Sequence, residues 1–235
     1  MSFRVKACAA TVAAACLLFT PAALASPGIS HAPVQVTGKQ LKNGLLPPSH
    51  ILPGYTTIFS NNSGGKLEHG TPFPIPSLKC SDFWPWLGTV DGFGETAFAT
   101  ASAGSGPHVT SVAEIFQQSV YQMASSHGAT SLFGQISAKY KSCRTVSVKD
   151  GHGGTLKRTV HARKTLRVGG HQSLLLTEYL ADSKVSGPPL VTYALWTLDG
   201  QDVYLISSQV ISVSSPKPTL SSLMLKLIPR VRALK

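Results

Sequence analysis

Acidic residues are scarce in this chain: Asp and Glu together number 10 among 235 residues, against 21 Lys and Arg. So few carboxylates leave little material for acid–base chemistry. Charged residues make up only 13% of the composition and hydrophobic residues 43%. This balance argues against extended disorder, because disordered chains combine low hydrophobicity with high charge. The formal net charge of +11 favours anionic partners, although such a charge also serves solubility alone.

Common catalytic motifs are missing as well. The sequence contains no G-x-S-x-G elbow, no P-loop, no G-x-G-x-x-G after an expected strand and no H-E-x-x-H. The eight histidines include no pair at the i, i+2 or i, i+4 spacing of a local metal site, so neither a metal nor a cofactor is predicted. Asp82, Asp91 and Glu95 come nearest to a carboxylate cluster, but they flank a short expected helix and a glycine-rich turn, where capping and turn roles are ordinary.

Residues 1–25 have the three parts of a secretory signal peptide: a short basic start, an apolar stretch, and a small-x-small end. The apolar stretch is too short, and too soon interrupted by Pro21, for a good transmembrane span. We expect cleavage after Ala25, which leaves no transmembrane helix. Two alternatives stay open: an uncleaved anchor, and lipidation at Cys16, whose preceding alanines loosely resemble a lipobox.

Cysteine is also rare, and removal of the signal peptide leaves only Cys80 and Cys143. An even count in an oxidising compartment predicts a disulfide between them. That bond closes a loop of about 63 residues, which is worth roughly 4 kcal/mol in the chain-entropy model. The alternative is a reactive free thiol. The protein is predicted to be secreted and to be associated with the cell envelope.

The rest of the chain is expected to form a tether followed by one domain. Residues 26–53 are rich in Pro, Gly and Ser without sustained periodicity, which indicates a tether. The domain then occupies residues 54–235. Its fold class is predicted as α+β, with an antiparallel β-sheet, helices packed on it and one disulfide.

Hydrophobic periodicity and turn residues predict the elements of this domain. Ser111 and Glu114 form a capping box, S-x-x-E, before apolar residues at helical spacing, which predicts a helix that stops at Gly128. A second helix leads up to Cys143, and a third covers residues 219–228. Strands are expected over residues 55–60, 96–102, 143–148, 156–168, 172–180, 191–198 and 202–211. Asp199-Gly200 is a strong hairpin signal and predicts a type I′ turn.

Two groups of residues are candidates for binding. In the strand 156–168, alternation places the basic residues on one face; the predicted anionic-ligand site consists of Lys157, His161, Arg163 and Arg167. The alternative is a solvated sheet face that carries charge against aggregation. The second group is aromatic and consists of Trp84, Trp86 and Trp196, which are candidates for lining a pocket. Packing of these rings against the disulfide and the sheet is the alternative.

Taken in order, these features resemble the extracellular sensor domain of PknH-like mycobacterial serine/threonine kinases and related secreted actinobacterial proteins. The matching features are Leu45–Pro47, Cys80 with Asp82 and Trp84, the expected helix around Phe116, Cys143 and the closing β-meander. The resemblance covers about residues 45–230. It implies one α/β domain with an antiparallel sheet and a cleft for an unidentified ligand. That domain has a second disulfide, for which no cysteines exist here, and no kinase domain is attached, so a stand-alone secreted relative is the expectation.

Three functions are compatible with these observations. The first is a non-enzymatic binding or sensor-like module for an anionic envelope polymer, lipid or small ligand; no specific nucleic-acid motif is present. The second is an extracytoplasmic hydrolase whose site is assembled from distant residues. The third is a structural wall protein without a ligand. An enzyme is expected to show convergent polar side chains with perturbed pKa values in one pocket, whereas a binding module is not.

Overall fold

The structure, a computed structural model, describes residues 36–64, 75, 78–81, 83, 93–104, 114–149, 154–184, 189–210 and 219–235. These residues all belong to one structural unit, Pro33–Lys235. The expected signal peptide and Trp84, Trp86, Asp82 and Asp91 lie outside the described residues.

Eight strands form one antiparallel sheet in the order β1-β2-β3-β8-β7-β6-β5-β4. Their bounds are β1 Thr56–Gly64, β2 Ala97–Gly104, β3 Glu114–Gln122, β4 Thr145–Lys149, β5 Thr155–Val168, β6 His171–Asp182, β7 Leu190–Asp199 and β8 Asp202–Val210. The predicted antiparallel sheet is thereby confirmed, and so is the α+β class. The edge strands are β1 and β4.

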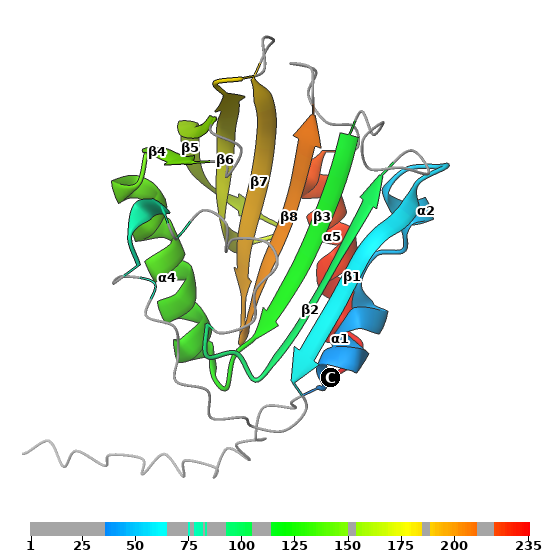
Figure 1. The fold of residues 1–235 in the computed structure, drawn as a ribbon. Helices are drawn as coiled ribbons and strands as arrows, with labels where there is room; N and C mark the ends of the chain where they lie inside the picture. Colours follow the sequence, from blue (N-terminus) through cyan, green and yellow to red (C-terminus); the bar gives the residue numbers. More distant parts are fainter. Residues whose placement is uncertain are drawn as a thin grey trace, which may run out of the picture. The chain divides into compact units, whose positions relative to one another are not determined.

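Helices pack on both faces of the sheet. The helix α4 (Ser126–Ser142) packs with one apolar cluster, and we call that side the α4 face. The helices α1 (Gly38–Gly44), α2 (Pro48–Ile51) and α5 (Leu220–Arg232) belong to a second cluster on the other side, the α5 face. Figure 1 shows α4 in front of the strands and α5 behind them. Within the described ranges, no helix is long and apolar enough to span a bilayer.

The two long helices follow from their caps and apolar stripes. Ser125 caps α4 by accepting a hydrogen bond from the amide of Gly128 at 3.1 Å. Helical spacing then turns one stripe inward, consisting of Ala129, Leu132, Phe133, Ile136 and Tyr140. Thr219 caps α5 in the same way. The helix continues through Pro229 to Arg232, beyond the end expected at residue 228.

The helix predicted after the capping box at Ser111 is wrong. Glu114–Gln122 form β3, which lies between β2 and β8 in the centre of the sheet. In so short a segment the apolar residues fit both the helical and the strand period. β3 pairs along its length with two neighbouring strands, and most of its residues are buried, so tertiary contacts override the local signal.

Residues 36–53, expected to belong to a tether, are part of the folded unit. Two glutamine side chains of β3 bind this segment to the α5 face. The side-chain amide of Gln118 accepts from Leu46 N at 2.8 Å and donates to Leu46 O at 2.6 Å. Gln122 Oε1 accepts from Val36 N at 2.9 Å. Because of these bonds, Leu41, Leu45 and Leu46 are buried in the core while the backbone groups of Val36 and Leu46 keep hydrogen-bond partners.

We expect Gln118→Leu to lower the free energy of unfolding by about 2 kcal/mol, because it leaves the buried amide and carbonyl of Leu46 unsatisfied. Urea unfolding followed by circular dichroism measures this change. Gln135→Leu, on the outward side of α4, is the control and should change the stability by less than about 0.5 kcal/mol. Equal stability of the two variants would contradict the docking role of Gln118.

The hairpin predicted at Asp199-Gly200 is present, but its turn differs from the expected type. Asp199 pairs with Asp202, so the two turn residues are Gly200 and Gln201. Only Gly200 has a positive φ, of 58°, whereas a type I′ turn needs two such residues. Glycine at the first turn position is instead the pattern of a type II′ turn.

Candidate functional site

A β-bulge divides the predicted basic stripe between the two faces of the sheet. The register of β5 against β6 shifts between Val160 and Ala162, and an extra residue in one strand inverts the alternation beyond it. Val160 accordingly packs in the cluster of the α4 face, whereas Leu166 and Val168 pack in the cluster of the α5 face. The expectation that all odd-numbered residues of this strand share one face is therefore wrong.

Three lysines and a histidine lie together on the α5 face of β4 and β5. Lys157 and His161 precede the inversion, Lys164 follows it, and Lys149 stands on the edge strand β4, where its Nζ donates to Thr155 Oγ1 at 3.3 Å. We call Lys149, Lys157, His161 and Lys164 the basic face. All four are exposed. The ring of His161 lies 4.7 Å from that of Tyr179 on β6, measured between centroids, so an aromatic surface adjoins the charges.

The other two predicted residues point to the α4 face. Arg163 donates from Nη2 to Ser137 Oγ of α4 at 2.5 Å, and Arg167 donates from Nη1 to the carbonyl of Gly170 at 2.7 Å. Both side chains are thus engaged within the fold. The structure therefore brings Lys157 and His161 together with two lysines that the sequence prediction omitted, and separates them from Arg163 and Arg167.

The carboxylates among the described residues form hydrogen bonds and ion pairs with groups outside the basic face. Glu114 accepts from Tyr55 and Ser208, Glu95 from the amide of Phe93, and Asp182 from the amide of Lys184. Ion pairs join Asp199 to Arg232 at 2.6 Å and Asp202 to Lys235 at 2.7 Å. No ion pair between described residues involves a residue of the basic face. Its three lysines are therefore not neutralised by any described carboxylate.

An ion pair lies in the interior beneath α4. Arg158, which is 1% exposed, places Nη1 3.4 Å from Glu178 Oε1, and its guanidinium lies 5.6 Å from the ring centroid of Tyr140. Burial raises the pKa of Glu178, and Arg158 partly opposes that shift. Burial likewise raises the pKa of Asp202 despite its contact with Lys235. One signal for Arg158 was visible in the sequence, because it interrupts the mostly apolar even-numbered positions of the strand.

Trp196, the aromatic candidate that lies among the described residues, belongs to the core. Trp196 has no exposed surface and lies in the cluster of the α4 face, where its ring stacks on that of Tyr121 at 6.1 Å between centroids. It packs rather than lines an open pocket. Trp84 and Trp86 lie outside the described residues.

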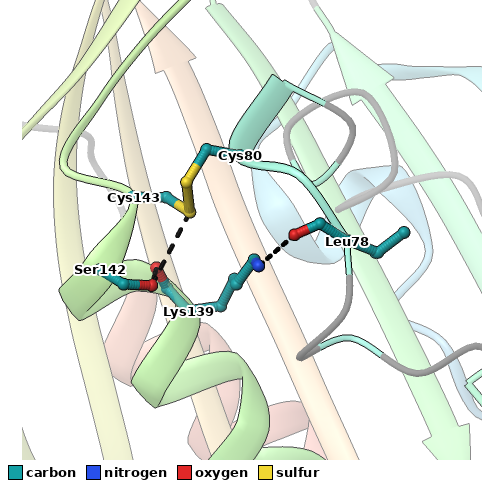
Figure 2. The surroundings of a disulfide bond; sticks show 5 residues. All are labelled: Leu78, Cys80, Lys139, Ser142 and Cys143. Atoms are coloured by element: carbon teal, nitrogen blue, oxygen red, sulfur yellow. Dashed lines mark hydrogen bonds between the residues drawn. A yellow bond between two sulfur atoms is a disulfide. The ribbon is translucent and has the colours of Figure 1, made fainter.

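The predicted disulfide between Cys80 and Cys143 is present and joins the end of α4 to the segment that contains Leu78. Figure 2 shows the bond beside Lys139, whose Nζ donates to the carbonyl of Leu78. Phe83, three residues after Cys80, packs edge-on against Tyr140 at 5.2 Å between ring centroids. The bond therefore holds this segment against the helix that covers Arg158 and Glu178.

Neither carboxyl with a raised pKa is placed to contact a substrate. Glu178 is 7% exposed and Asp202 2% exposed, and each faces a cation of its own. Among the residues that the structure describes, His, Cys, Asp and Glu form no group of three suited to a metal ion.

No family model matches the sequence, and neither does any curated protein. The crystal structure of the extracellular domain of PknH from Mycobacterium tuberculosis is similar, with a TM-score of 0.59 and 13% sequence identity, over 84% of this chain and 97% of that chain. An uncharacterized protein from Mycobacterium smegmatis aligns with a TM-score of 0.37 and 11% identity, over 78% and 92% of the two chains. At these identities the likeness concerns the fold alone. The chain has the fold of the PknH extracellular domain.

Proposed function

We propose that this protein is a non-enzymatic, extracytoplasmic binding domain, and that its basic face binds an extended anionic polymer of the cell envelope. The observation that carries the proposal is the group of three exposed lysines and one exposed histidine on one sheet face, none of them in an ion pair with a described carboxylate. The fold shared with the extracellular domain of PknH supports the location.

The shape of the basic face favours a polymer over a compact ligand. Lys157 and Lys164 are seven residues apart along β5, which corresponds to about 20 Å at the rise of a strand. Lys149 pairs with Thr155 and Lys157 with Ser147, so the two lysines are diagonal neighbours on one face of the β4–β5 ladder. A chain of repeated anionic groups can contact all of these charges at once, and each exposed contact adds a modest, salt-sensitive contribution.

The β-bulge provides a matched test of this proposal. Lys157→Glu with Lys164→Glu reverses two charges of the basic face, and Arg163→Glu with Arg167→Glu reverses two charges of the same strand on the opposite face. We expect the first pair to weaken binding to long-chain polyphosphate at least roughly tenfold at low salt, and the second pair to have a much smaller effect. Calorimetric titration at two salt concentrations measures both.

Equal weakening by the two pairs would mean that only net charge matters, and would refute the assignment to one face. Binding to vesicles of phosphatidylglycerol but not to polyphosphate would refute the polymer as the ligand. Circular dichroism of each variant checks that the fold is retained.

A further inference from the structure

A second surface feature lies at the other edge of the sheet from the basic face. It is a pocket with a volume of about 270 Å³ on the α5 face, between α1, β1, β2 and the end of α5. Its polar lining includes Lys42, Thr57, Ser60 and Arg230, and its apolar lining includes Leu46 and Pro47. The volume is close to the lower limit of about 300 Å³ for small-molecule sites. It suits a small organic ligand better than a bare ion.

A bulge in β1 directs two hydroxyl groups into this pocket. Thr57 pairs with Ala103 and Ser60 with Ala101, and the register shifts between Thr57 and Phe59. In regular alternation, residues three apart point to opposite faces. The extra residue brings both onto the α5 face, where Ala101 and Ala103 pack. Bulges commonly re-aim side chains in this way next to binding sites.

Arg230 is held at the pocket by the backbone of α1. Its Nε donates to Gly44 O at 3.2 Å and its Nη2 to Asn43 O at 3.5 Å. The end of α5 packs closely on Gly44, where a Cβ would lie 2.9 Å from Leu234 Cδ1 and 3.2 Å from Val231 Cγ2. The guanidinium is thus oriented before any ligand arrives, and it retains further N–H donors.

We propose that this pocket binds a small phosphate monoester. Two cations, Lys42 and Arg230, and two hydroxyls, Thr57 and Ser60, line it, and no carboxylate does so among the described residues. Charge-assisted bonds from lysine and arginine are the usual means of binding phosphate oxygens. The apolar residues, Leu46 and Pro47, then receive the organic part of the ester. The proposal is independent of the basic face, because the two sites share no residue.

Glycerol 3-phosphate is the probe, and glycerol is its uncharged control. Titration of the isotopically labelled protein should give saturable amide shifts at Ser60 and Ala101 with the phosphate ester and none with glycerol. Lys42→Gln should weaken the affinity roughly tenfold, as expected for the loss of one charge-assisted contact. Lys39→Gln is the matched control, since it removes the same charge from α1 but lies outside the pocket.

Equal affinities of the two lysine variants would overturn the proposal, and so would the absence of saturable shifts at Ser60 and Ala101. Shifts confined to β4 and β5 would also overturn it, because they would place the ester on the basic face. Conversely, failure of the polyphosphate experiment leaves these outcomes unaffected, so the two proposals fail separately. Ser60→Ala gives a second test and should weaken binding without loss of charge.

Discussion

Replacing Cys80 and Cys143 by alanine should lower the free energy of unfolding by about 4 kcal/mol. The bond joins residues 63 positions apart, and its removal frees a long loop in the unfolded chain. In the folded state it leaves Phe83 and Leu78 to be held against α4 by non-covalent contacts alone. Guanidinium unfolding of the wild type and the variant at neutral pH measures the difference.

Two controls separate the covalent bond from its surroundings. Reductant should destabilise the wild type by a similar amount and leave the double alanine variant unchanged. Lys139→Met removes the contact with Leu78 but keeps the disulfide, and its effect should be about 1 kcal/mol. A loss below about 1 kcal/mol in the double alanine variant would show that the bond does not stabilise this fold.

Breaking the buried ion pair is the second change with a large expected effect. Arg158→Leu or Glu178→Leu alone should lower the free energy of unfolding by about 3–5 kcal/mol, because each leaves the partner's charge buried. The double replacement should recover a large part of that loss, since an apolar pair of similar volume needs no desolvation of charge. A double-mutant cycle from urea unfolding gives the coupling energy.

The control for this cycle is Lys157→Leu, which removes a cation next to Arg158 in sequence but from the exposed face of the same strand. It should change the stability by less than about 0.5 kcal/mol. Single variants whose losses simply add in the double variant would contradict the coupling. Arg158 and Glu178 would then act independently of one another.

The same pair predicts a pH dependence. Burial raises the pKa of Glu178 above its ordinary value of 4.5, so the folded state binds this proton more tightly than the unfolded chain. Protonation therefore favours the folded state, and this contribution is lost as the pH rises from about 4.5 through the raised pKa. The stability of the wild type relative to Glu178→Gln should fall over that window. A rise would show that attraction by Arg158 outweighs desolvation.

Much of the fold is encoded locally. The apolar stripe of α4, the short turns between β5 and β8, and the cysteine count each depend on neighbouring residues or on composition. Each of these features led to a correct prediction from sequence. The hairpin at Gly200 shows the limit of such signals, because its position was predicted correctly and its turn type was not.

Contacts between distant residues decided the rest. Whether Glu114–Gln122 form a helix or a strand depended on pairing with β2 and β8. The docking of residues 36–46 depended on Gln118 and Gln122, about 80 positions away in the chain. Neither interaction has a local sequence signature, since the free energy comes from pairing and burial that exist only once the sheet has assembled.

The candidate sites show the same division most clearly. Composition alone established an excess of cations, and the alternation of β5 established that they lie on a strand. Which cations of β5 share a surface was decided by a single inserted residue after Val160. A second inserted residue, after Thr57 in β1, brought the two hydroxyls of the pocket onto one face. A bulge forms where the ladder with the neighbouring strand and the packing of both faces require it. Because side chains alternate with a period of two, one extra residue reassigns every side chain beyond it to the opposite face.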